Sequence, residues 1–312
     1  WSRCGDRAGG VVPVLGPIGL RAFEPEDQPR LEAIIRAAFA AGEISGWESH
    51  DIDHMARGVG STPGSTYLAV SDGTVVGFLA ADYSMIIIVP EARRQGIGSA
   101  LVQTALAHHP QLELAPPIGS DVAEAFLRSV GFAPHHLLRQ LDRRDGSAVD
   151  EPAAPEGFAL RTYEEADFSA YHALLNRAFS DHPTPLSVSV ERMRAVHARP
   201  DFDPTLILLL APSDRPEDFV GFVFVRLHPM TDGEVKGGIG MIGVDRHVRQ
   251  RGFGRMLLRW GIWRLQQAGC RLIELEVVDI NDRALPLYES EGFVPVQAWP
   301  YWAHLGGLHD EG

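Results

Sequence analysis

The stretch Met241-Ile242-Gly243-Val244-Asp245-Arg246-His247-Val248-Arg249-Gln250-Arg251-Gly252-Phe253-Gly254-Arg255 decides how this chain folds. It begins as a short apolar strand and then passes through basic residues and glycines. From Gly252 to Gln267 the apolar residues fall on one helical face, which predicts a helix. Glycines let backbone N–H groups approach a ligand closely, and a helix N-terminus carries a partial positive charge. Together with its arginines, the loop suits a pyrophosphate.

The loop alone leaves one other interpretation open, namely a glycine-rich turn that only begins a helix. Two common phosphate-binding loops are excluded. A P-loop needs Gly-Lys-Ser or Gly-Lys-Thr after its spacer, and this stretch has neither. A dinucleotide-binding fingerprint needs a third glycine, but Gly254 is followed by Arg255-Met256-Leu257.

The landmarks of this segment recur in the first half of the chain in the same order. Arg93-Arg94-Gln95-Gly96-Ile97-Gly98 matches Arg249-Gln250-Arg251-Gly252-Phe253-Gly254. The offsets grow slowly: 140 from Leu20 to Leu160, 144 from Gly77 to Gly221, 156 from Gly96 to Gly252 and 161 from Gly131 to Gly292. This ordered set predicts a duplicated domain with longer loops in the second copy.

The duplication divides the 312 residues into four predicted parts. We expect residues 1–17 to be an unstructured or cloning-derived N-terminus, because they lack an initial Met and an apolar signal core. Residues 18–143 form the first copy and residues 157–306 the second. The intervening residues 144–156 are polar and rich in Pro, Ala and Gly, as linkers are. Helical periodicity covers 30–39 and 165–179, and strand patterns cover 206–210 and 273–277.

The composition limits the classes of partner. A net charge of −13 argues against nucleic acid and anionic membranes as bulk partners, and no apolar run approaches the ~20 residues of a membrane span. The only cysteines, Cys4 and Cys270, do not suggest a disulfide framework, so a reducing, cytoplasmic location is expected. The oligomeric state, monomer or homodimer, stays open.

The second copy resembles the GNAT acetyltransferase superfamily. Arg249-x-x-Gly252-x-Gly254 follows a short strand, and then come another strand, Asn281, Ala284, Leu287-Tyr288-Glu289 and Gly292-Phe293. The first copy shows a weaker likeness, so the resemblance covers nearly the whole chain outside the linker. It implies an α/β (α+β) fold in each copy, with a mixed, mostly antiparallel sheet flanked by helices. It also implies acetyl-CoA as co-substrate, with its pyrophosphate on the glycine loop.

Within the superfamily, the tandem arrangement is similar to that of mycothiol synthase. The shared segments are Asn176 to Pro183, Asp201-Phe202-Asp203-Pro204, His228-Pro229 and Gly233-Glu234-Val235. One departure is the longer spacing between Glu234 and the strand before the loop, filled by Lys236-Gly237-Gly238-Ile239-Gly240.

The resemblance also implies the residues that contact CoA. In the second copy they are Ile242, Gly243, Val244, Arg249, Gln250, Arg251, Gly252, Phe253, Gly254, Arg255 and Asn281. In the first copy they are Arg93, Arg94, Gln95, Gly96, Ile97, Gly98 and Ser99. A backbone N–H near Gly243 and Val244 would polarise the thioester carbonyl. Asn281 could instead, or in addition, be a helix N-cap.

The implied reaction moves an acetyl group to the primary amine of a small molecule by direct attack in a ternary complex. Tyr288 matches the general acid that protonates the leaving thiolate; the alternative is a packed aromatic. Glu234 is the expected base, while Glu276, Asp181, His182 or a water remain alternatives. A helical register places Leu127 and Ser120 in the first copy where the second has Tyr288 and Asn281. We therefore expect a catalytic second copy and a degenerate first one.

Other interpretations are a non-catalytic acyl-CoA sensor and a scaffold in which the first copy supports the second. The pairs His108-His109 and His135-His136 lack metal-ligand spacing, so no metal is expected. The group Trp299, Pro300, Tyr301 and Trp302 either lines an acceptor pocket or packs in a core.

Overall fold

The computed structural model describes residues 16–44, 49–60, 62–144, 147–182, 187–199, 202–230 and 233–306. The prediction for residues 1–17 falls mainly outside this part of the chain, as does Cys4. The chain divides into two compact units. The first unit comprises residues 1–135 and 301–312, and the second comprises residues 136–300.

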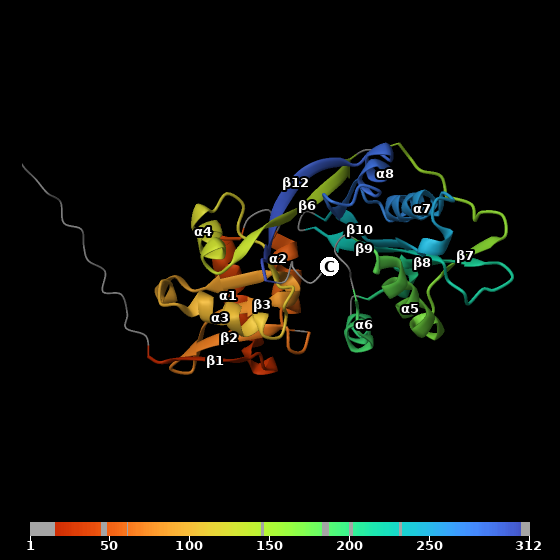
Figure 1. The fold of residues 1–312 in the computed structure, drawn as a ribbon. Helices are drawn as coiled ribbons and strands as arrows, with labels where there is room; N and C mark the ends of the chain where they lie inside the picture. Colours follow the sequence, from red (N-terminus) through yellow and green to blue (C-terminus); the bar gives the residue numbers. More distant parts are fainter. Residues whose placement is uncertain are drawn as a thin grey trace, which may run out of the picture. The chain divides into compact units, whose positions relative to one another are not determined.

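The first unit contains a four-stranded antiparallel sheet in the order β1-β2-β3-β4 (Figure 1). Its elements are β1 (Ile18–Ala22), α1 (Gln28–Ala40), α2 (Ser49–Gly58), β2 (Thr66–Ser71), β3 (Thr74–Ala80), β4 (Met85–Ile88), α3 (Ile97–Leu106), β5 (Glu113–Leu114) and α4 (Asp121–Ser129). Successive residues of a strand pack in two different cores, because their side chains point to opposite faces of the sheet. Leu68 and Phe78 pack with α1 and α2, whereas Ala69 and Leu79 pack with α3.

The second unit repeats this plan around a larger sheet. Its elements are β7 (Phe158–Thr162), α5 (Phe168–Phe179), α6 (Val190–His197), β8 (Ile207–Pro212), β9 (Gly221–Pro229), β10 (Val235–Val244), α7 (Phe253–Gln267), β11 (Leu272–Val278) and α8 (Leu285–Ser290). With β6 (Phe132–Arg144), the strand order is β6-β11-β10-β9-β8-β7. The β10–β11 pair is parallel, and the other strand pairs described in this unit are antiparallel. The predicted fold class is therefore confirmed.

Two helical layers cover this second sheet, and Figure 1 shows α7 and α5 on its opposite sides. Val223 and Val225 of β9 pack with Leu257 and the other buried residues of α7. Phe222, the residue before Val223, packs instead with α5. Short 3₁₀ turns occupy Pro25–Asp27, Ala81–Tyr83, Pro90–Ala92, Glu165–Asp167, Pro204–Leu206 and Arg246–Val248.

The duplication is visible in side-chain geometry as well as in topology. Arg21 donates to both carboxylate oxygens of Asp27 at 2.6 Å, and Arg161 donates to both oxygens of Asp167 at 2.6 Å. Both carboxylates also complete a capping box at the start of the first helix of their copy. The side-chain hydrogen bonds lower the pKa of both aspartates, so both pairs stay ionised around neutral pH.

Two strands contribute residues to both units. β6 (Phe132–Arg144) passes from the first unit to the second after His135, and β12 (Val294–His304) returns to the first after Pro300. In the described part of the chain, no helix has both the length and the apolar character needed to cross a membrane.

Candidate functional site

β10 and β11 lie side by side for three residue pairs and then part. The parallel register runs from Gly237–Ile273 to Ile239–Leu275 and stops there. Beyond this point β10 continues beside β9 as far as Val244, and β11 continues beside β6 as far as Val278. A β-bulge at Gly240 bends β10 where the two strands separate. The edge of β10 from Gly240 onward therefore presents backbone groups that β11 does not pair.

The loop after β10 leads directly from this edge to the N-terminus of α7. Gln250 and Gly252 have φ of 65° and 80°, so the backbone enters the left-handed region twice within three residues. Gly252 is the N-cap of α7, and no side chain caps the helix. A Cβ on Gly252 would meet no atom within 4 Å. The loop thus directs uncapped N–H groups toward open space, which is the geometry of an anion site.

Arg249 anchors this loop to the rest of the second unit. Its Nε donates to the Val244 carbonyl at 3.0 Å, and its terminal nitrogens donate to Asp181 at 2.6 and 2.8 Å and to the Ala178 carbonyl at 2.9 Å. The hydrogen bond from Arg249 holds the pKa of Asp181 below its usual range. The guanidinium group therefore fixes where the loop lies relative to the end of α5.

The remaining loop residues differ in whether their side chains are already in contact with the rest of the protein. Phe253 is buried in the core against Phe158, with ring centroids 4.7 Å apart, so only its backbone can reach a ligand. Arg255 forms an ion pair with Glu291. Arg251 is exposed, and its side chain has no hydrogen bond or ion pair within the described residues, which leaves it available to a phosphate. A Cβ on Gly254 would approach only Leu287, at 3.8 Å.

Tyr288 and Asn281 lie beyond β11, in and just before α8. Tyr288 is 7% exposed, and burial raises the pKa of its phenol to about 12, so the hydroxyl keeps its proton throughout the physiological range. Asn281 accepts a hydrogen bond from the Ala284 backbone N–H at 3.3 Å, and its amide lies 3.1 Å from His182 Nε2. The side-chain oxygen of Asn281 thus caps the turn that leads into α8.

Comparison with known proteins identifies the family of this chain. The acetyltransferase (GNAT) family model matches residues 169–293, and a GNAT domain model matches residues 62–134. A mycothiol acetyltransferase of Thermomonospora curvata is 32% identical over 238 residues, covering 72% of this chain and 77% of the relative. The chain belongs to the GNAT acetyltransferase family. It is a tandem GNAT N-acetyltransferase, and the predicted family, enzyme class and duplicated domain are confirmed.

Other relatives and solved structures match most of this chain. A mycothiol acetyltransferase of Thermobispora bispora is 30% identical over 289 residues, covering 86% of this chain and 93% of the relative. A solved GCN5-related N-acetyltransferase from Sphaerobacter thermophilus superposes with a TM-score of 0.59 at 24% identity, covering 92% of this chain and 95% of that chain. A tandem GNAT protein from the clavulanic acid biosynthesis pathway gives a TM-score of 0.55 at 18% identity, covering 92% and 98%. The structural likenesses establish the fold.

The first GNAT copy has the same loop conformation. Arg94 and Gly96 have φ of 64° and 77°, and Gly96 is the uncapped N-cap of α3. Arg93 Nε donates to the Ile88 carbonyl at 2.8 Å, and its NH2 group reaches Glu43 at 2.6 Å, which reproduces the Arg249 anchor. The Gln95 amide donates to the Glu91 carbonyl at 3.2 Å.

In the first copy, the residues that correspond to Tyr288 and Asn281 are Leu127 and Ser120, and both have structural roles. Leu127 is 2% exposed in the core, and Ser120 caps α4 by accepting from the Ala123 N–H at 3.3 Å. A Cβ on Gly98 would meet the Phe126 ring at 2.9 Å, so this glycine is required for packing. Ile97 is buried, and Ser99 is half-buried. The first copy therefore has the same loop conformation, with a leucine at the position that corresponds to Tyr288.

The four candidate general bases lie at different points of the second unit. Glu234 is exposed and precedes β10 in the β9–β10 hairpin, six residues before the bulge at Gly240. At ~3.3 Å per residue, this spacing amounts to about 20 Å along the strand. Asp181 is held by Arg249, and His182 lies beside Asn281. Glu276 is exposed on β11, one residue beyond the last β10–β11 pair.

A buried ion pair near the parting strands was missed by the sequence interpretation. Lys236 of β10 is 3% exposed, and its Nζ lies 3.0 Å from Glu274 Oε2 on β11. The Gln140 amide of β6 donates to the same oxygen at 3.0 Å. The alternating pattern Ile273-Glu274-Leu275-Glu276-Val277 predicts a strand with one polar face. It does not identify Lys236 as the partner of Glu274.

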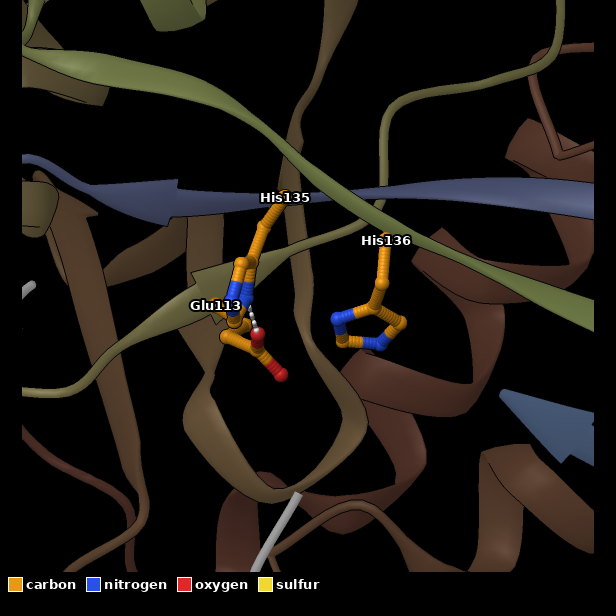
Figure 2. A group of neighbouring side chains, drawn as sticks. All are labelled: Glu113, His135 and His136. Atoms are coloured by element: carbon orange, nitrogen blue, oxygen red, sulfur yellow. Dashed lines mark hydrogen bonds and ion pairs between the residues drawn. The ribbon is translucent and has the colours of Figure 1, made fainter. Parts of the chain in front are cut away.

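The histidine pairs and the aromatic group make contacts of their own within the described residues. His109 Nε2 lies 3.0 Å from the Gly64 carbonyl oxygen. Figure 2 shows Glu113, His135 and His136; His135 Nδ1 lies 2.6 Å from Glu113 Oε1, and His136 begins the second unit. Because the unit boundary falls between the two histidines, we assign no metal site to them. Trp302 is 2% exposed in the core of the first unit, which agrees with the packing interpretation.

Proposed function

We propose that the second copy transfers an acetyl group from acetyl-CoA to the primary amine of a small molecule, by direct attack in a ternary complex. Membership of the GNAT family supports acetyl-CoA as the donor. The relatives named mycothiol acetyltransferases support a small-molecule amine as the acceptor. The observation that carries the assignment to this copy is the combination of parted strands, an uncapped glycine loop and a protonated Tyr288.

Each part of the site has a role in this reaction. The α7 N-terminus and Arg251 would hold the pyrophosphate, and the unpaired edge of β10 near Gly243 and Val244 would orient the thioester and polarise its carbonyl. Tyr288 would protonate the departing thiolate, since its raised pKa keeps the phenol neutral until the thiolate develops beside it. Asn281 would align CoA while it caps the turn before α8.

We further propose that the first copy holds CoA without turning it over. Its loop has the same pair of left-handed residues and the same arginine anchor. Leu127 stands at the position of Tyr288, so no acid is available there. The scarcity of cysteines, with Cys270 a buried free thiol, favours a cytoplasmic location for the enzyme.

A direct test is product formation with purified protein. Acetyl-CoA is incubated with glucosamine, cysteamine, L-cysteine amide and a short peptide, and the acetylated amine is measured by mass spectrometry. We expect one acetyl-amine for each CoA released. Tight binding of acetyl-CoA in calorimetry without transfer to any amine would replace this proposal with the non-catalytic sensor.

A further inference from the structure

The sheet of the second unit has a polar region on the face opposite α7. On β11, the side chains of Ile273, Leu275 and Val277 belong to the core beneath α7. Because side chains alternate along a strand, Glu274 and Glu276 point to the other face. Two carboxylates therefore follow β11 toward the point where it parts from β10.

The neighbouring strand β10 offers almost no side chains on that face. Ile239 packs in the α7 core, and a Cβ on Gly237 would meet Leu265 of α7 at 2.9 Å. The alternate positions of β10 therefore share the face of the carboxylates. They are Lys236, Gly238 and Gly240. Of these only Lys236 carries an ionisable group, so β10 itself supplies no carboxylate between the hairpin and the bulge.

Lys236 and Glu274 are committed to each other. Their charged atoms lie 3.0 Å apart with Lys236 3% exposed, and Gln140 donates to the same carboxylate oxygen at 3.0 Å. Removing a buried charge from its partner is costly, so this pair persists when substrates bind. Glu274 is thus neutralised within the protein, and Glu276 is the next carboxylate along the strand.

Glu276 stands where the strands separate. Leu275 and Ile239 form the last β10–β11 pair, so Glu276 and Gly240 are the next residues on their strands. Glu276 is exposed, and the glycine at the bulge places no side chain between it and the edge of β10. Glu234, the base expected from the sequence, directly precedes β10 and is six residues before Gly240.

We propose that Glu276 binds the acceptor's ammonium group and accepts its proton. This inference rests on the proposed acetyl transfer. The ammonium group gives one proton to the Glu276 carboxylate, and the neutral nitrogen forms a bond to the thioester carbon. The C–S bond then breaks, the Tyr288 phenol protonates the sulfur, and the second proton of the nitrogen returns to the phenolate through water. The products are the amide, CoA thiol and one proton that Glu276 releases to solvent.

Two side chains of β9 limit the class of amine acceptor that would bind beside Glu276. A Cβ on Gly240 would lie 2.9 Å from Arg226 Nε, and a Cβ on Gly238 would lie 3.3 Å from His228 Nε2. The glycines therefore let both side chains lie over β10 toward the carboxylates. Arg226 and His228 can donate hydrogen bonds to oxygens. The acceptor expected here is a primary amine attached to a body with hydroxyl or carboxylate oxygens, such as an amino sugar.

The test compares Glu276→Gln, Glu276→Asp and Glu234→Gln, with Glu217→Gln as an exposed control on the same unit. The acceptor is glucosamine, or whichever amine of the panel the wild-type enzyme acetylates best. We expect Glu276→Gln to lower kcat/KM for the amine by about 100-fold or more, because a positioned base contributes at least that factor. Glu276→Asp should recover part of this loss, and the low-pH limb of the rate profile should flatten in Glu276→Gln. Acetyl-CoA affinity in calorimetry should stay unchanged.

The charged and titratable groups on the same face are Glu274 of β11 itself and, on the neighbouring strands, Lys236, Arg226, His228, Asp142 and Arg144. They remain in every variant, so a lost low-pH limb would report Glu276 itself. A Glu276→Gln enzyme with normal kcat/KM, or a comparable loss confined to Glu234→Gln, overturns this inference and leaves the proposed function standing. Absence of transfer by the wild-type enzyme overturns both.

Discussion

Arg249 and Asp181 are joined by two hydrogen bonds, 2.6 and 2.8 Å long, although 68 residues separate them in the chain. The pair ties the glycine loop to the end of α5. Arg93 and Glu43 form the corresponding link in the first copy at 2.6 Å. Arg93 and Arg249, which the sequence suggests as CoA contacts, thus each hold the glycine loop of their own copy in place.

Weakening this link should loosen the loop and reduce acetyl-CoA affinity. The pair is partly exposed, so screening limits its contribution to stability to about 1 kcal/mol or less. Asp181→Asn should therefore raise the Kd of acetyl-CoA about three- to tenfold with little change in Tm, which calorimetry and thermal unfolding can measure. Glu43→Gln is the matched control in the first copy and should leave turnover unaffected. An unchanged Kd in Asp181→Asn would show that Arg249 holds the loop without its carboxylate.

The pH dependence of that affinity follows from the same pair. The pKa of Asp181 is depressed by Arg249, so its contribution is fully present above the unfolded pKa of ~4. It is lost only as pH falls through the lower folded value. Between pH 5 and 8 the contribution of this pair to acetyl-CoA binding should therefore be constant.

Gly254→Ala should separate ligand binding from folding. Gly252 has a φ of 80°, so any side chain there strains the backbone as well as blocking the ligand. Gly254 lies inside α7, where a Cβ would touch only Leu287 and where Ala is favoured over Gly by about 1 kcal/mol. We expect the variant to keep or raise its Tm and to lose at least tenfold in acetyl-CoA affinity at the second loop. Unaltered calorimetric affinity would contradict the assignment of this loop to the pyrophosphate.

Disrupting the first loop should leave catalysis largely intact. Gly96→Val places a branched side chain at a φ of 77°, over the uncapped N-terminus of α3. If the first copy only binds CoA, the variant should lose one binding event in calorimetry and keep most of the wild-type kcat. A large loss of kcat in a folded Gly96→Val enzyme would mean that the first copy carries the chemistry.

Tyr288→Phe should retain the buried ring and remove only the proton. A positioned general acid contributes about 100- to 10,000-fold, so kcat should fall within that range. The KM for acetyl-CoA should change little, because the hydroxyl acts mainly in the transition state. The raised pKa of about 12 predicts that the high-pH limb due to Tyr288 lies above the range in which the wild-type enzyme is assayed. A variant with more than half the wild-type rate, with chemistry rate-limiting, would identify Tyr288 as a packing residue.

Much of the fold was readable because it depends on local periodicity. The predicted helix from Gly252 to Gln267 and strand from Ile273 to Val277 correspond to α7 (Phe253–Gln267) and β11 (Leu272–Val278). The duplication was readable from ordered glycines, and those at 131 and 292 share a φ of 89° that a side chain rarely adopts. One glycine of each loop, Gly96 or Gly252, has a positive φ where the chain turns into a helix.

The sequence by itself determined the family and the duplicated plan, because these follow from motifs a few residues long. Only the tertiary structure decided where β6 and β12 pass between units, since strand pairing joins residues far apart, as Leu272 joins Arg144. It likewise decided that Arg249 is an anchor, that Lys236 neutralises Glu274, and that Glu276 rather than Glu234 stands at the parting strands. Each of these depends on which side chains meet across a sheet, and strand register fixes that only once the chain has folded.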